Sequence, residues 1–185
     1  MGFYALFTGK GFFSMVVLGI DPGYAIVGYG VIEMKNNRYR TMEHGAITTK
    51  AGEDFGRRLE IIYDSVSAVL AQYKPDAVSV EKLYFTNNKT TGIGVAEARG
   101  VILLAGIQKG LQIAEYTPMQ VKSAISGYGK AEKKQVMTMV AQILRLKNIP
   151  KPDDTADALA IAVCHAHSAG SRLASFYNLK KTRLT

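Results

Sequence analysis

The chain has 185 residues, 48% of them hydrophobic, with a formal net charge of +8. This fits one globular domain; no apolar run is long enough for a membrane span, and the single cysteine excludes a disulfide framework. The lone Cys164 fits a reducing compartment, so we expect a cytoplasmic protein, and the basic charge indicates either simple solubility or a polyanionic partner such as nucleic acid.

The first part of the chain predicts a small antiparallel sheet. Residues 1–14 show no clear period and are expected to be a non-native or disordered extension outside the fold. A buried apolar run over residues 16–20 predicts the first strand, which ends at Asp21 in an Asp-Pro-Gly turn. Residues 24–34 and 39–49 predict two further strands, joined by a polar turn into an antiparallel meander.

A helix and a fourth strand follow. Apolar residues at intervals of three and four predict a helix over residues 53–73, with one buried face formed by Leu59, Ile62, Val66 and Leu70. Residues 77–81 predict a short buried strand that ends in a second carboxylate, Glu81. Because a helix between two strands normally makes a right-handed crossover, we expect this strand to lie parallel to the first.

The remaining chain predicts mostly helices. After an exposed loop, the expected elements are a helix over 91–108, a strand over 111–116, a short helix from 117, a helix over 131–146 and a helix from Asp153 or Asp154 to about Ser168. Residues 171–185 form a basic tail that we expect to be flexible. The predicted fold class is α/β, with a five-stranded mixed sheet, three strands antiparallel and two parallel, flanked by helices.

Four carboxylates are predicted to meet at one edge of this sheet. Asp21 and Glu81 end strands that we expect to be parallel neighbours, and Asp154 and Asp157 are three residues apart on one helix face. Such a cluster is costly without a cation, and Mg²⁺ prefers oxygen ligands. Two such ions can promote an in-line displacement, so the pattern favours phosphodiester hydrolysis.

Taken singly, these acids have simpler explanations. Asp21 could be an ordinary turn residue, Glu81 a surface charge, and Asp154 a helix cap, as we expect for Asp153. Asp157 is different because it opens an apolar run, where an isolated acid needs a partner or an ion.

A series of short motifs resembles one known family. They are residues 19–23 (GIDPG), 28–30 (GYG), 81–85 (EKLYF), 97–100 (EARG), 116–122 (YTPMQVK), 127–133 (GYGKAEK) and 154–160 (DTADALA). In this order they resemble the RuvC family of bacterial Holliday junction resolvases, which belongs to the ribonuclease H-like superfamily. The resemblance runs from about Met15 to about Gly170, and it implies a nuclease domain over residues 15–170.

The resemblance implies a Mg²⁺-dependent homodimer that nicks two opposed strands of a four-way DNA junction symmetrically during recombination and repair. The matching metal-binding catalytic acids are Asp21, Glu81, Asp154 and Asp157. Two Mg²⁺ ions per site are expected, and Mn²⁺ can substitute. The family's partners are four-way junction DNA and the RuvA–RuvB branch-migration complex.

The same resemblance implies residues that contact DNA and the second subunit. Tyr84 or Phe85 is expected to stack on an unpaired base, and Lys122 and Lys133 to meet the scissile region. The helix over 91–108 matches the family's dimer element. This helix carries the small residues Gly92, Gly94, Ala96 and Gly100, which suit close packing against a second subunit. A helix buried within one subunit would show the same pattern.

Three other functions compete with this interpretation. A sugar kinase or chaperone-type ATPase also begins with a strand and an Asp-x-Gly turn, but this chain is short for two such lobes. A junction-binding module without catalysis would not need four acids. A YqgF-type nuclease shares the fold and the first acid, although the Asp154-x-x-Asp157 helix and the Tyr84–Phe85 loop favour the resolvase.

Overall fold

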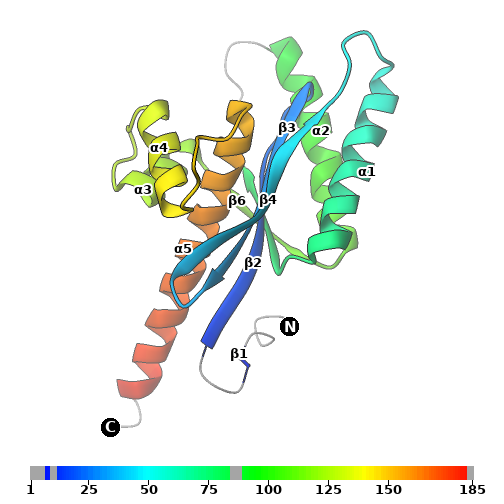
Figure 1. The fold of residues 1–185 in the computed structure, drawn as a ribbon. Coiled ribbons are helices and arrows are strands. Elements are labelled where there is room, and N and C mark those ends of the chain that lie inside the picture. The colour runs from blue at the N-terminus through cyan, green and yellow to red at the C-terminus, as the bar shows by residue number, and fades with distance from the viewer. Residues whose placement is uncertain (1–6, 9–11, 84–88, 183–185) are drawn as a thin grey trace.

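The computed structural model describes residues 7–8, 12–83 and 89–182, which fold around one mixed sheet (Figure 1). The strands follow the order β4-β3-β2-β5-β6, and a two-residue strand, β1 (Phe7–Thr8), pairs with the start of β2. The five main strands are β2 (Phe12–Asp21), β3 (Ile26–Lys35), β4 (Arg38–Thr48), β5 (Ala77–Glu81) and β6 (Gln112–Tyr116).

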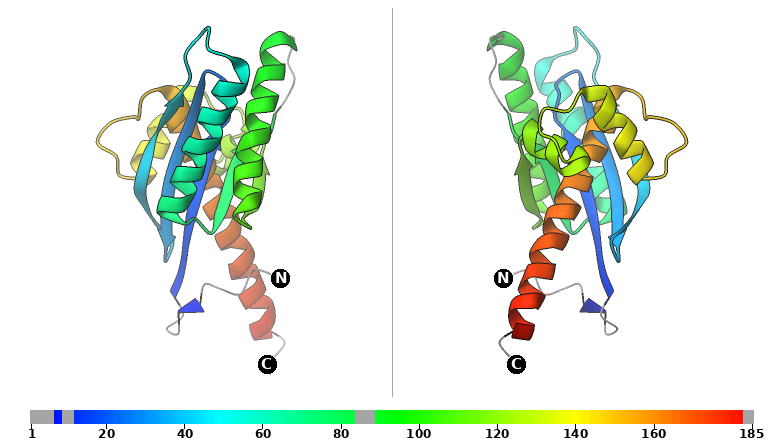
Figure 2. Two further views of the ribbon diagram at one scale, coloured as in Figure 1. Left: turned by 90° about the vertical axis from the view of Figure 1, so that its right-hand side faces the viewer. Right: turned by 90° about the vertical axis from the view of Figure 1, so that its left-hand side faces the viewer.

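Helices cover both faces of the sheet and enclose two apolar cores (Figure 2). One face carries α1 (Phe55–Tyr73) and α2 (Lys89–Gln108), and the other carries α3 (Pro118–Ser126), α4 (Lys133–Ile143) and α5 (Asp153–Thr182). Within the described ranges, no helix combines the length and apolarity needed to cross a membrane.

The strand pairing confirms the predicted five-stranded mixed sheet. Strands β2, β3 and β4 form an antiparallel meander, and β5 and β6 continue the sheet in parallel with β2. Ile20 lies opposite Val80 in the β2–β5 ladder, so the next residues, Asp21 and Glu81, leave the sheet at the same edge. The first turn of α5 lies at this end of the sheet as well (Figure 1).

The first strand and the last helix are longer than predicted. Strand β2 begins at Phe12, and Ser14 pairs with Lys35, so the first strand includes residues expected to lie outside the fold. Helix α5 continues to Thr182, so the expected end near Ser168 is wrong. No proline or glycine follows Gly170 to stop the helix. The division of the chain into an extension, a nuclease domain over 15–170 and a flexible tail remains a prediction.

The buried face of α1 also differs from the prediction by one residue. Arg58, Ile62, Val66 and Leu70 are the buried positions, whereas Leu59 is only partly buried. Arg58 lies one helical turn before Ile62 and therefore shares its buried face. A long basic side chain thus takes the place at which the prediction had put Leu59. Its aliphatic stem can be buried while its guanidinium makes polar contacts.

Glycines allow α5 to lie directly on the central strands. A Cβ atom on Gly19 of β2 would lie 2.2 Å from the carbonyl oxygen of Ala158, and one on Gly28 of β3 would lie 1.9 Å from that of Asp154. Both distances are far below van der Waals contact, and both involve helix backbone that cannot rotate away. Any side chain at these positions would therefore push α5 off the sheet.

We predict that Gly19→Ala destabilises the protein by about 3 kcal/mol, at the upper end of overpacking costs. Thermal unfolding followed by circular dichroism should show a melting temperature lower by roughly 6–12 °C. The matched control is Gly170→Ala on α5, whose Cβ would meet only the end of Met34 at 3.5 Å. Equal melting temperatures for the two variants would contradict the close-contact explanation.

Candidate active site

Two strand ends bring the first pair of acids together. Asp21 ends β2 and Glu81 ends β5, and the charge of Glu81 acts on the carboxyl group of Asp21. Arg99 of α2 supports this edge, since its guanidinium pairs with Glu115 at 2.8 Å and its Nε donates to the backbone oxygen of Glu81 at 3.4 Å. The edge of the sheet is thereby tied to α2 behind it.

The first turns of α5 supply the other two acids. The contact at Gly28 holds the backbone of Asp154 against β3, and Asp157 follows three residues later. The Nζ atom of Lys133, the first residue of α4, lies 2.9 Å from a carboxylate oxygen of Asp157. Asp153, the first residue of α5, pairs with Lys151 at 2.7 Å and lies 3.8 Å from the same Lys133 ammonium group.

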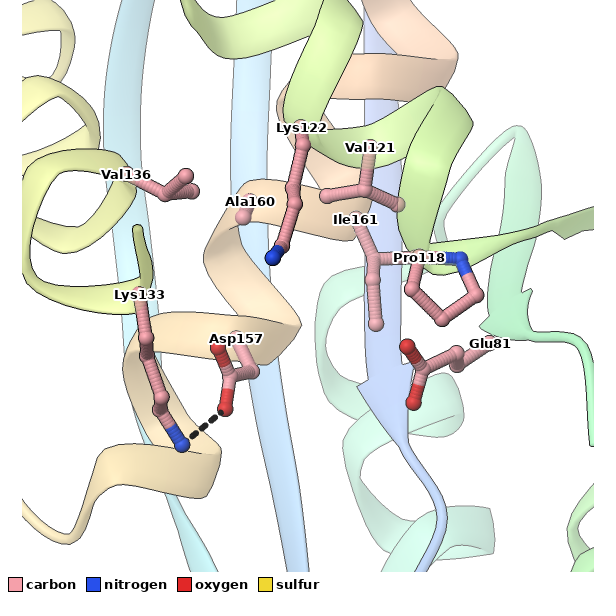
Figure 3. A pocket seen from close by; sticks show the side chains of 9 residues that line it. All are labelled: Glu81, Pro118, Val121, Lys122, Lys133, Val136, Asp157, Ala160 and Ile161. Atoms are coloured by element: carbon pink, nitrogen blue, oxygen red, sulfur yellow. Dashed lines mark ion pairs between the residues drawn. The ribbon is translucent and has the colours of Figure 1, made fainter. Parts of the chain in front are cut away.

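A small open pocket joins these elements (Figure 3). Its volume is about 180 Å³, and its polar lining consists of Glu81, Asp157, Lys122 and Lys133. Figure 3 shows the two ammonium groups and the two carboxylates directed into the same space. The rest of the lining is apolar, contributed by Pro118, Val121, Val136, Ala160 and Ile161.

The acids raise one another's affinity for protons. Burial, followed by the charges of Glu81, Asp157 and Asp154, raises the pKa of Asp21 to about 8. Burial and Asp157 raise the pKa of Glu81, and burial raises that of Asp157 although Lys133 opposes the shift. The hydrogen bond to Asp157 raises the pKa of Lys133, which therefore stays charged. The cluster thus holds more negative charge than one lysine neutralises.

The donor set fits a hard divalent cation by its chemistry. Four carboxylates at one edge offer only oxygen ligands, which Mg²⁺ and Mn²⁺ prefer, and their mutual repulsion would be relieved by positive charge. Among the residues that the structure describes, however, no three His, Cys, Asp or Glu side chains are placed to hold a metal ion together. Asp157 is paired with Lys133 instead, so metal binding requires that pair to adjust.

The structure brings most of the predicted site residues together. The four acids influence one another electrostatically, and Lys122 and Lys133 line the pocket with Glu81 and Asp157. Tyr84 and Phe85 lie outside the described residues.

Two arginines near the site had not been predicted to act there. Arg99 lies in the EARG motif, which pointed to its position without giving its contacts. The guanidinium carbon of Arg58 lies 3.4 Å from the centre of the Tyr24 ring, and its Nε donates to the Thr49 hydroxyl at 2.8 Å. This contact steadies the turn that follows Asp21; no pattern in the sequence pointed to it, because Arg58 adjoins an apolar helix face.

Comparisons with known proteins agree with one another. The family model described as "Crossover junction endodeoxyribonuclease RuvC" matches residues 17–165. A relative of that name from Clostridioides difficile (strain 630) is 52% identical over 154 residues, covering 83% of this chain and 91% of the relative. Another, from Halothermothrix orenii, is 53% identical over 154 residues, covering 83% and 93%. The solved structure of "T. thermophilus RuvC in complex with Holliday junction substrate" matches with a TM-score of 0.81 and 40% identity, covering 84% of this chain and 94% of that chain.

The raised pKa of Asp21 predicts how stability changes with pH without added metal. Between pH 4 and about 8 the unfolded chain loses a proton that the folded chain keeps, so the free energy of unfolding falls as pH rises. Asp21→Asn removes this effect, and we expect the variant to melt at least about 3 °C above wild type at pH 8. Melting curves at pH 5 and pH 8, with chelator present, should show the difference shrinking at pH 5. A difference that is independent of pH would argue against a proton held on Asp21.

Proposed function

Because this chain belongs to the RuvC family of crossover junction endodeoxyribonucleases, we propose that its acidic pocket cuts the backbone of four-way DNA junctions with divalent metal ions. The observation that carries the metal-dependent mechanism is the cluster of Asp21, Glu81, Asp154 and Asp157 at one sheet edge, flanked by two lysines. An acidic site beside basic side chains suits a polyanionic substrate that is cut with metal ions.

In this mechanism the four carboxylates bind the metal ions and fix their position. When bound, two Mg²⁺ ions, or Mn²⁺ in their place, supply an activated water and stabilise the leaving oxygen of an in-line displacement. Lys122 and Lys133 bind phosphate and offset the negative charge that develops on it. Water adds to the phosphorus and the 3′ oxygen leaves with a proton, so the products are a 5′ phosphate and a 3′ hydroxyl, which a ligase can rejoin.

The exposed face of α2 supports a homodimer. Ile93 is 58% exposed, Leu104 47% and Ile107 60%, and Gly100 between them has open space around it. The opposite side of α2, with Ala98 and Ile102, faces the core. Gly94 lies against Tyr24 whereas Gly100 is open, so the predicted small residues of α2 do not share one face. A second copy packed on this apolar stripe would pair two sites about a two-fold axis, as a two-fold-symmetric junction requires.

The family also implies an association with the RuvA–RuvB branch-migration complex, and a chromosomal DNA substrate implies a cytoplasmic location. We therefore include this association and this location in the proposal; they rest on the family and not on the geometry of the acidic pocket.

The direct test is cleavage of a synthetic four-way junction and of a linear duplex of the same sequence, with Mg²⁺ or with chelator. We expect paired, symmetric nicks on the junction only, and only with metal. Equal cutting of the duplex would contradict junction specificity, and cutting in chelator would contradict the metal mechanism.

Single substitutions extend this test to the acids. Glu81→Gln and Asp157→Asn should each reduce the cleavage rate by about 100-fold or more, because each removes a metal ligand. Junction binding, measured by gel shift, should survive. The matched control is Asp64→Asn, which removes an exposed acid on α1, on the other face of the sheet, and should cleave within about twofold of wild type.

The dimer prediction concerns Leu104→Glu, which places a charge in the centre of the apolar stripe of α2. We expect the variant to sediment as a monomer where wild type sediments as a dimer, because burying an unpaired carboxylate is costly. Gln72→Glu adds the same charge to an exposed position on α1 and should remain dimeric. A dimeric Leu104→Glu variant would place the interface elsewhere.

A further inference from the structure

A second exposed apolar surface lies on the opposite side of the sheet from α2. Met119 is 64% exposed and Tyr128 is 60% exposed. Among the described residues, they are the large exposed hydrophobic side chains that do not belong to α2. Met119 lies in α3, and Tyr128 lies in the turn between α3 and α4.

The two side chains belong to neighbouring parts of the surface. A Cβ atom on Gly129 would lie 2.7 Å from Cγ of Met119 and 2.9 Å from the Ser123 hydroxyl, so the turn folds back along α3. Met119 and Lys122 are three residues apart and share one side of the helix. Pro118, Val121 and Lys122 of α3 line the acidic pocket, so Met119 lies on a helix that forms one wall of that pocket.

The backbone of Tyr128 is held firmly although its ring is exposed. Its N–H donates to Oγ of Ser126 at 3.3 Å, and its carbonyl accepts from the N–H of Ala131 at 3.1 Å. The Ser126 hydroxyl in turn lies 2.8 Å from the carbonyl oxygen of Lys122 on α3. Because the backbone is already fixed, contact of the ring with a ligand costs only the freedom of the side chain.

We propose that Met119 and Tyr128 form a stacking surface for a base of the DNA strand that leads into the acidic pocket. This inference rests on the proposed function and adds a contact to it. The charges of the segment favour a nucleic acid over a protein, since residues 118–134 hold four lysines, Lys122, Lys130, Lys133 and Lys134, and one acid, Glu132. Lysines bind the phosphates of a strand while an aromatic ring and a polarisable thioether contact its bases.

The test uses the full chain, which contains no tryptophan. Tyr128→Trp therefore introduces a single indole reporter at the surface. We expect its emission to be quenched when a synthetic four-way junction binds in the presence of chelator, because an indole stacked on a base loses fluorescence. Tyr73→Trp, at the end of α1 on the other face of the sheet, is the matched control and should be unaffected.

Two further variants measure the contribution of the ring to affinity. Tyr128→Ala should weaken junction binding about tenfold, within the range for loss of one stacked base. The dependence of binding on salt should keep its slope, because no phosphate contact is removed. Tyr128→Phe keeps the stacking face and should bind like wild type, and all variants should melt at the wild-type temperature.

The outcomes separate this inference from the function on which it rests. If wild type binds and cuts the junction while the emission of the Tyr128→Trp variant is unchanged, or while Tyr128→Ala binds normally, the stacking surface is overturned and the proposed function stands. Normal DNA binding by Tyr128→Ala would leave this surface to a protein partner. If wild type binds no junction, both proposals fail together.

Discussion

The direct contact between α5 and the two central strands decides where the acidic site forms. Side chains between a helix and a sheet normally keep the two apart. Here Gly19, Gly28 and Gly30 have no side chains, so the strand backbone at Gly19 and Gly28 contacts the helix backbone and at Gly30 contacts Leu159. The contact at Gly28 holds Asp154 beside β3, and the next turn carries Asp157. The acids of the helix thus reach the acids of the strands.

The site that results is an electrostatic balance between acids and lysines. Four carboxylates come from three elements far apart in the sequence, and burial together with their repulsion raises the pKa of Asp21 to about 8. Lys133, at the start of α4, offsets part of this charge through its ion pair with Asp157, and Lys122 faces the same pocket. The arrangement favours ligands that bring cations to the acids and phosphate to the lysines.

Much of this arrangement could be predicted from the sequence, because the apolar pattern identifies the buried strands and the right-handed crossover rule orients them. A buried strand ending in Asp21, a crossover helix and a buried strand ending in Glu81 leave little choice about which strand ends share an edge. Arg58 was missed because periodicity selects a helix face without resolving neighbouring positions. The length of α5 was missed because a basic, polar stretch is as compatible with a helix as with a tail. The pair between Lys133 and Asp157 depends on tertiary packing that spacing does not encode.

A crystal structure of the wild-type protein soaked in Mn²⁺, with anomalous scattering used to locate the metal, would test the four-acid metal site most directly. We predict two anomalous peaks among Asp21, Glu81, Asp154 and Asp157, with Lys133 released from Asp157. Manganese bound elsewhere, with the Lys133–Asp157 pair intact, would contradict the assignment of these four acids as the catalytic metal site.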